Sequence, residues 1–252
     1  MCMHIVSRLY LISLILVLSG CALVEARKIE TSSFLPYGDA LVERLERAPF
    51  HGLWVRDLEQ QGPIADNYSS VLILPINYQI PLEQLIVAKN LPPRLKRIRQ
   101  DEISEMARYA REVFYRELTD RGSQLRRADD LDEDTLLVEL AIVEIQPTNV
   151  PVNVAGTVAG FFVPGGGVLS AAGGSGSIAI EGVVRDGNSG RAMLLFKDRA
   201  IDKSSLFSVR DFQQYAHIRQ AIDSWAREVS ELLATPVNHK VEGELPVTLN
   251  PF

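Results

Sequence analysis

The sequence predicts an α+β fold, with a mostly antiparallel sheet and two long amphipathic helices packed on one face of it, preceded by a cleaved signal peptide. Three observations predict this fold class. The chain opens with a short basic and apolar leader, several β-rich runs are bounded by turn residues, and two long segments repeat their apolar residues every three or four positions. This mixture of strands and amphipathic helices is typical of α+β domains.

The first 20 residues have the order of parts found in an export signal. Arg8 supplies a positive charge, residues 9–18 form an apolar run, and Ser19 and Gly20 are the small residues that a signal peptidase needs. A helix over this run would be only about 15 Å long, whereas the hydrocarbon core of a bilayer is about 30 Å thick. We therefore expect residues 1–20 to be a signal peptide and not a permanent membrane span.

The tetrapeptide Leu18-Ser19-Gly20-Cys21 has the pattern of a lipobox. The Cys21 thiol can be alkylated by a diacylglyceryl donor, and two or three acyl chains such as palmitate would then hold the mature protein to a membrane. The competing interpretation is an ordinary secretory signal with a chance cysteine near the cut. We expect residues 21–31 to be a polar tether. Ala22 follows the cysteine, and resemblance to enterobacterial lipoproteins, in which an Asp there favours the inner membrane, implies the outer membrane.

The composition excludes several classes of protein. Cys2 would leave with the leader and Cys21 would be acylated, so the mature domain has no disulfide, thiolate metal site or cysteine nucleophile. The loss of Arg8 changes the formal net charge from −6 to −7, which makes the chain a poor candidate for binding nucleic acid. The remaining length is ample for one folded domain, which we place at residues 32–236.

The first half of the domain is less regular than the second. Residues 36–48 can form a short amphipathic helix with Leu41, Val42 and Leu45 on one face. Residues 53–55 and 70–76 are strand candidates, the second because it is β-rich and bounded by turn residues. The following residues, 81–100, are ambiguous, because Pro92 and Pro93 break any helix that runs through them.

The clearest helix is predicted at residues 101–121. Asp101, Glu102 and Glu105 would lie at its positive N-terminal end, and Gly122 follows as a C-cap. Its apolar residues follow the i, i+3, i+4, i+7 pattern: Ile103, Met106, Ala107, Ala110, Val113, Phe114 and Leu118.

Three strands are predicted in the second half of the domain. In residues 135–145, alternate side chains are apolar, and Glu139 lies on the other face from them. Residues 177–185 and 191–200 read as two strands, and residues 186–190 between them are typical of a hairpin turn.

A second long helix is predicted at residues 208–234, and Pro236 ends it. Residues 237–252 form a proline-bearing, extended tail. The apolar residues of this helix alternate by three and four: Tyr215, Ile218, Ile222, Trp225, Val229 and Leu232.

Residues 146–180 form an insertion that is rich in glycine and carries no charge. Three interpretations of this segment are open: a flexible or buried loop inside the sheet, a hairpin that contacts membrane or a partner protein, and a phosphate-binding loop. The third is disfavoured, because no Walker-type pattern with its lysine occurs. Long apolar loops are uncommon unless they are functional or disordered. The second interpretation gives five candidate contact residues: Gly156, Gly160, Phe161, Phe162 and Val163.

Two charged clusters are more simply solvated surface. The acidic residues 129–134 lack the glycine and the terminal glutamate of a calcium loop. A basic cluster could contact anionic headgroups or cell-wall polymers near the anchor, and it consists of Lys89, Arg94, Lys96, Arg97 and Arg99.

No pattern typical of catalysis or metal binding occurs in the chain. His51, His217 and His239 are scattered, without the spacing of a zinc site, and there is no G-x-S-x-G nucleophile elbow. We therefore predict no catalytic residue, no metal ligand and no cofactor.

The sequence also resembles a known family. Its landmarks here are residues 33–37 (Ser-Phe-Leu-Pro-Tyr), 68–71 (Tyr-Ser-Ser-Val), 117–122 (Glu-Leu-Thr-Asp-Arg-Gly) and 178–186 (Ile-Ala-Ile-Glu-Gly-Val-Val-Arg-Asp), followed by Ser189-Gly190. Together they look like the bacterial lipoproteins filed as domain of unknown function 3313, over nearly the whole mature chain. That resemblance implies an envelope lipoprotein and carries over no catalytic residue.

These observations favour a non-enzymatic lipoprotein that is anchored in the outer membrane by Cys21, faces the periplasm and binds or scaffolds other envelope proteins. The alternative is an auxiliary subunit of an envelope export or transport complex that uses the glycine-rich segment to contact membrane or partner. A hydrolase acting on cell-wall or lipid substrates is the third and least favoured hypothesis.

Overall fold

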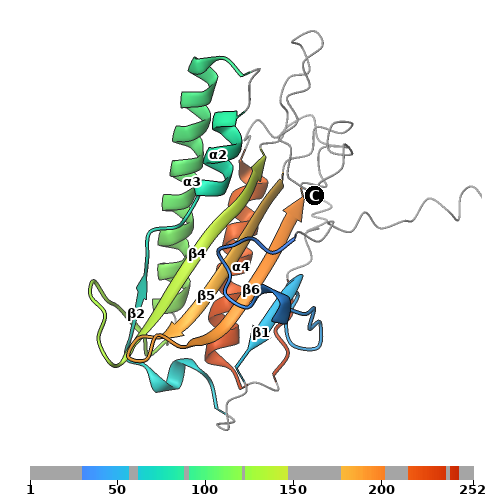
Figure 1. Cartoon of the computed structure of the whole chain (residues 1–252). Helices are drawn as coiled ribbons and strands as arrows, with labels where there is room; N and C mark the ends of the chain where they lie inside the picture. Colours follow the sequence, from blue (N-terminus) through green and yellow to red (C-terminus); the bar gives the residue numbers. More distant parts are fainter. Residues whose placement is uncertain are drawn as a thin grey trace, which may run out of the picture.

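The structure is a computed structural model, and it describes residues 30–56, 62–87, 91–120, 123–146, 177–201, 215–236 and 239–243. Six strands and three α-helices make up this part of the chain (Figure 1). In chain order they are β1 (Gly52–Val55), β2 (Ser70–Ile73), α2 (Gln79–Val87), α3 (Pro93–Thr119), β3 (Arg126–Arg127), β4 (Thr135–Gln146), β5 (Ser177–Asp186), β6 (Ala192–Ile201) and α4 (Ala216–Ala234).

The six strands form one sheet in the order β1-β6-β5-β4-β2-β3. The α+β class is therefore confirmed, but the sheet is mixed and not mostly antiparallel. The pairs β1/β6, β4/β5 and β5/β6 are antiparallel, whereas β2 runs parallel to both β3 and β4. The chain returns from β2 to β4 through two helices, and a helical crossover of this kind brings two strands into the same direction.

Helices α3 and α4 cover one face of the sheet, as predicted, and pack against each other behind the strands in Figure 1. Every apolar residue that defined the predicted periodicity of α3 is buried. In α4, Ile218, Ile222, Trp225, Val229 and Leu232 are buried as well. These side chains join the inward-facing residues of β4, β5 and β6 in a single main core, whose burial is the chief stabilising contribution to such a fold.

Helix α3 is longer at its N-terminus than predicted. It begins at Pro93, so Asp101 and Glu102 lie about two turns inside the helix and not at its positive end. The pair of prolines does not break the helix because Pro93 occupies the first helical position, where its missing N–H has no intrahelical acceptor. Pro81 similarly falls in the first turn of α2 and is tolerated there.

The predicted helix at residues 36–48 is wrong. Only a single 3₁₀ turn forms, Gly38–Ala40, after Tyr37 in the left-handed region (φ 59°). Val42 then makes a bridge to Leu53, beside β1. The apolar face proposed for this helix does not pack as a unit, since Val42 and Leu45 are exposed.

The remaining predictions for the second half are largely confirmed. Strands β4, β5 and β6 match the expected runs within one residue, and the turn between β5 and β6 contains Gly190 with φ 67°, a conformation that favours glycine. Residues 208–214 of the second predicted helix lie outside the described residues, and α4 confirms the rest. Among the described helices, none is both long and apolar enough to cross a bilayer.

Candidate functional site

The predicted lipidation site and the predicted contact residues lie outside the described residues. This applies to Leu18, Ser19, Gly20 and Cys21 at the leader, and to Gly156, Gly160, Phe161, Phe162 and Val163 in the glycine-rich insertion. The structure does describe where both segments join the domain. Those two junctions, the basic cluster, a buried acidic cluster and two surface hollows are the places where function can be sought.

The chain that follows the tether is fixed to the sheet by hydrogen bonds. We call residues 31–36 the N-terminal strap. It crosses the far face of the sheet, opposite α3 and α4 (Figure 1). The backbone N–H and the hydroxyl of Ser32 donate to the two carboxylate oxygens of Glu181, at 2.7 and 2.5 Å, and the Lys197 ammonium donates to the hydroxyl of Thr31 at 2.6 Å. Glu181 and Lys197 are cross-strand neighbours on β5 and β6, so the sheet presents both groups together.

The carboxyl group of Glu181 is fully buried beneath the strap. Burial raises the pKa of Glu181, while its hydrogen bonds from Ser32 and the charge of Lys197 act in the opposite direction. A buried carboxylate without partners would be costly, so the strap and the sheet depend on each other at this point.

Apolar contacts of the strap complete the cover of the far face. Leu35 is buried in a small cluster with Val183 and Leu195, and the Phe34 ring packs against that cluster and against a second one that contains Ala141. The family landmark at residues 33–37 therefore corresponds to a segment that packs on the sheet, not to a helix.

The glycine-rich insertion leaves and re-enters the sheet at a closed junction. β4 ends at Gln146, which pairs with Ser177, the first residue of β5. Next to this pair, the Glu144 carboxylate accepts a hydrogen bond from the Ser177 hydroxyl and forms an ion pair with Arg199 at 2.8 Å. Ile201, the last residue of β6, pairs with the same Ser177.

Part of the predicted basic cluster has a structural role. Lys96 donates to the carbonyl of Ile86 at 2.9 Å and thereby joins the end of α2 to the start of α3. Arg99 donates to the Glu102 carboxylate at 2.8 Å and to the Tyr215 hydroxyl at 2.9 Å. Burial and the hydrogen bond to Glu102 raise the pKa of Tyr215. Lys89 lies outside the described residues.

The structure also shows a buried acidic cluster that the sequence did not reveal, between β6, α4 and the start of β1. Asp198 Oδ2 accepts a hydrogen bond from the indole of Trp225 at 2.6 Å, and its Oδ1 lies 3.2 Å from His51 Nδ1. Burial raises the pKa of Asp198, and the charge of His51 opposes that shift. Burial, together with the charge of Asp198, raises the pKa of Glu228 to about 8.

The Asp198 carboxylate is held by groups of the fold: the indole of Trp225 on one oxygen, and the backbone N–H and imidazole of His51 on the other. In the sequence, the one indication that Asp198 is buried is its spacing: it lies two residues after Phe196 on β6 and therefore on the same, inward-facing side of the strand. Within the described ranges no group of three or more His, Cys, Asp and Glu residues is placed to hold a metal ion. His239 contacts Glu231 on the surface, so it does not join His51.

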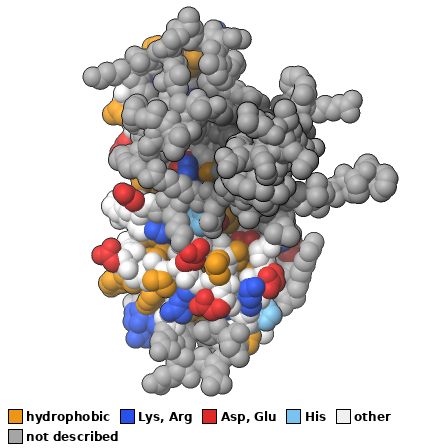
Figure 2. All heavy atoms as spheres, turned by 90° about the vertical axis from the view of Figure 1, so that its right-hand side faces the viewer, with side chains coloured by type: hydrophobic (Ala, Val, Ile, Leu, Met, Phe, Trp, Pro, Cys, Tyr) orange, Lys and Arg blue, Asp and Glu red, His pale blue; other side chains and the backbone are white. Residues whose placement is uncertain are grey.

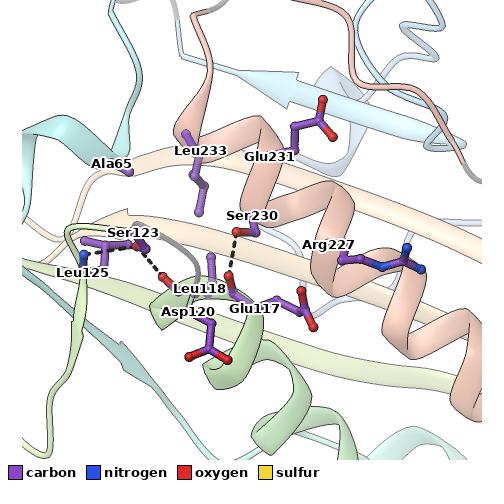
Figure 3. A pocket seen from close by; sticks show the side chains of 11 residues that line it. Ala65, Glu117, Leu118, Asp120, Ser123, Leu125, Arg227, Ser230, Glu231 and Leu233 are labelled. Carbon is purple, nitrogen blue, oxygen red and sulfur yellow. Dashed lines mark hydrogen bonds between the residues drawn. The ribbon is translucent and has the colours of Figure 1, made fainter.

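One surface hollow lies where the C-terminal end of α3 meets α4 (Figure 3) and encloses about 330 Å³. Its polar groups are engaged in local structure. The Ser230 hydroxyl donates to the carbonyl of Glu117 at 2.8 Å, and the Ser123 hydroxyl donates to the carbonyl of Leu118 at 2.6 Å. No histidine is among the lining residues of this hollow, and both serine hydroxyls donate to backbone carbonyls and not to the lining carboxylates of Glu117, Asp120 and Glu231.

A second hollow, of about 450 Å³, lies between the start of β2 and the acidic residues 129–132. Arg126 and Arg127 of β3 line it, and Arg127 also stacks on the Tyr115 ring with its guanidinium carbon 4.1 Å from the ring centroid. The acidic residues are exposed at a turn before β4, as predicted. In the view of Figure 2, acidic and basic side chains are interspersed over the coloured part of the β1 side of the molecule, which is not what a nucleic-acid-binding face requires.

Comparison with known proteins identifies the family. The sequence profile described as "Protein of unknown function (DUF3313)" matches residues 60–229. The chain belongs to this family. The match confirms the resemblance to this family. It includes the landmarks at residues 68–71, 117–122 and 178–190 and ends in α4, whereas the landmark at residues 33–37 lies before it. A search of curated proteins finds no matching sequence.

Solved structures give only distant similarities. The PelC dodecamer from Paraburkholderia phytofirmans matches with a TM-score of 0.38 and 11% sequence identity, over 73% of this chain and 98% of that chain. The hypothetical protein CT253 from Chlamydia trachomatis matches with a TM-score of 0.31 and 12% identity, over 68% and 87% of the two chains. Similarities at this level carry no argument about function.

Proposed function

We propose that this protein is a non-enzymatic lipoprotein, anchored in the outer membrane through acylated Cys21, whose domain faces the periplasm and binds or scaffolds other envelope proteins. The observation that carries the proposal is the lipobox at residues 18–21, directly after an export leader. The position of the N-terminal strap supports it. Because Ser32 is held to Glu181, only a short stretch of chain separates the predicted anchor from a fixed point on the domain.

Labelling with radioactive palmitate in intact cells tests the anchor. The chain offers a matched pair of variants, since Cys2→Ser removes the leader cysteine and Cys21→Ser removes the predicted lipidation site. We expect wild type and Cys2→Ser to take up label and to fractionate with the outer membrane, and Cys21→Ser to lose both properties. Palmitate uptake by Cys21→Ser, or its absence from wild type, would refute the anchor.

The alternative function, an auxiliary subunit of an export or transport complex, is favoured by one observation. The glycine-rich insertion starts and ends at a junction held by Glu144, Ser177 and Arg199. A closed junction of this kind gives a long segment a defined starting point on a rigid sheet, which suits a docking element.

Crosslinking in intact cells separates the two functions. In the alternative, the double substitution Phe161→Ser and Phe162→Ser removes the partner crosslinks of wild type while the thermal unfolding temperature is unchanged. Leu131→Ser, at an exposed apolar residue far along the chain, is the control. An unchanged set of crosslinked partners in the double variant would contradict the alternative and leave the scaffold function in place.

A further inference from the structure

The junction of α2 and α3 exposes apolar and basic side chains together. We call residues 84–87 and 91–100 the helix tip. At the end of α2, Ile86 and Val87 are 70% and 71% exposed, and at the start of α3, Leu95 is 46% exposed. Ile98, one turn further along α3, is exposed as well. Four of the nine large apolar residues that are exposed in the described part of the chain thus lie within this short stretch. Single exposed apolar residues are ordinary, but a cluster of them marks an interaction surface.

The charge of the helix tip is opposite to that of the whole protein. The formal net charge of the chain is −6, yet the helix tip contains four basic residues and no acidic one. Two of the four, Lys96 and Arg99, make the contacts described above. Arg94 and Arg97 are exposed at the surface of the first two turns of α3, so their charges face solvent.

The position of these charges is unfavourable for the helix itself. A helix N-terminus carries partial positive charge, which favours acidic side chains in the first turn and disfavours basic ones. The first turn of α3 has no acidic residue, and its basic residues follow directly after Pro93. Natural sequences depart from local preference of this kind mainly where function requires it.

The apolar and basic residues of the helix tip share one surface. Ile98 lies one turn from both Leu95 (i+3) and Arg94 (i+4), and residues at these spacings are neighbours on a helix. The hydrogen bond from Lys96 to the carbonyl of Ile86 holds the end of α2 against the same region. In Figure 1 the first turns of α3 extend beyond the ends of the strands, so this surface is at an extremity of the fold.

We propose that the helix tip is a second membrane contact, which inserts Leu95 and Ile98 among the acyl chains of anionic phospholipid while Arg94 and Arg97 bind the headgroup phosphates. Apolar side chains that enter the boundary between headgroups and acyl chains, flanked by arginines at the phosphate level, are the chemistry of an interfacial helix. This inference rests on the proposed function, because the phospholipid is that of the leaflet in which Cys21 would be anchored. It adds that the domain is held against that leaflet and not merely tethered to it.

The predicted mature chain has one cysteine, Cys21, and acylation would block its thiol. A cysteine introduced elsewhere can therefore be labelled specifically. Full-length protein purified from bacterial envelopes, with either Leu95→Cys or Leu131→Cys, is labelled with nitrobenzoxadiazole and mixed with vesicles. Leu131 is 47% exposed, like Leu95, but lies in the acidic turn before β4. The vesicles contain phosphatidylcholine alone or mixed with phosphatidylglycerol, and both kinds carry lipid-borne quenchers. Wild type treated with the same label provides the background.

We expect the label at position 95 to shift to the blue and to be quenched only by vesicles with phosphatidylglycerol, and the label at 131 to stay aqueous with both. Each basic side chain near an anionic surface strengthens the contact about fivefold. Reversing the charges of Arg94 and Arg97 together (Arg94→Glu, Arg97→Glu) should therefore reduce many-fold the fraction of protein whose label at position 95 contacts the vesicle. The control pair Arg44→Glu and Arg126→Glu reverses two exposed arginines elsewhere on the surface and should leave this fraction unchanged. The contact should also weaken with salt.

Flotation of the same vesicles separates this inference from the anchor. Protein that floats with both vesicle types while the label at 95 stays aqueous refutes the helix tip and leaves the anchor standing. Protein that floats only with phosphatidylglycerol, with the label at 95 shielded, supports the helix tip and refutes the anchor. Protein that floats with neither refutes both, and quenching at 95 that is equal with the two vesicle types refutes the role of anionic lipid.

Discussion

Replacing Glu228 by Gln should stabilise the protein at neutral pH. The Glu228 side chain lies in the interior with 8% of the residue's surface exposed, next to Asp198, and its pKa is raised to about 8. A carboxyl group whose pKa is higher in the folded than in the unfolded state favours folding fully only below its unfolded pKa, near 4.5. That contribution declines as the pH rises towards 8, because the folded protein must then either hold a proton or bury a charge.

The size of the effect follows from the two pKa values. Between pH 4.5 and pH 7 the loss is about 1.4 kcal/mol per pH unit, or about 3 kcal/mol at pH 7. Glutamine fills the same volume without a charge, so Glu228→Gln should gain most of this and raise the unfolding temperature by about 6–12 °C in a domain of this size.

Thermal unfolding measured by circular dichroism from pH 5 to pH 8 tests the prediction. The difference between Glu228→Gln and wild type should be small at pH 5 and grow with pH. Glu231→Gln, on the solvent side of the same helix, is the control and should change little, since its pairing with His239 is exposed. A difference that is constant over this range, or a variant that is less stable than wild type throughout, would refute the assignment of the buried charge.

Three further predictions concern contacts that hold the fold together, each checked by chemical denaturation. Ser32→Ala removes the hydroxyl that donates to Glu181 and leaves only the backbone N–H of the strap on that buried carboxylate, so it should cost about 1–3 kcal/mol; Ser32→Thr should keep most of the stability, and no loss in the alanine variant would mean that the hydroxyl does not help to hold the strap. Gly182→Ala should destabilise the protein by about 1–3 kcal/mol, because the added methyl group would lie 2.1 Å from the Phe196 ring. An unchanged free energy of unfolding would show that the ring can move aside. Arg47→Ala should lower the free energy of unfolding by about 2–3 kcal/mol, because the buried guanidinium donates to the carbonyl of Leu232 near the end of α4. A change below about 0.5 kcal/mol would mean that water takes the place of the guanidinium as the donor to this carbonyl.

The long helices and the hairpin could be predicted because their signals are local. The apolar spacing in α3 and α4 and the turn before Gly190 depend only on neighbouring residues. The parallel pairing of β2 with β4 could not be predicted, because it depends on the path of the chain through α2 and α3. The start of α3 is not evident from the sequence, because a pair of prolines is compatible both with a broken helix and with a helix that has proline at its first position, as Pro93 is in α3.

The candidate sites also differ in whether their residues are neighbours in the sequence or come from separate elements of the fold. The lipobox at residues 18–21 is a short contiguous motif, so the sequence alone is enough to propose it. The pairs Ser32–Glu181 and Asp198–Trp225 join residues from separate elements, and nothing in the local sequence of either partner indicates the other. The helix tip required both kinds of information. Its basic residues were visible as a cluster, but only the structure shows which of them are used in packing and which exposed apolar residues accompany them.

The attachment of the N-terminal strap determines how the domain would respond to a pulling force. Tension on the chain before Thr31 would reach the sheet at two cross-strand neighbours, Lys197 of β6 and Glu181 in the middle of β5. Both strands are interior, because β6 lies between β1 and β5, and β5 lies between β6 and β4. The load would therefore be shared by the ladders of backbone hydrogen bonds on both sides of these strands, instead of peeling an edge strand from the sheet one bond at a time.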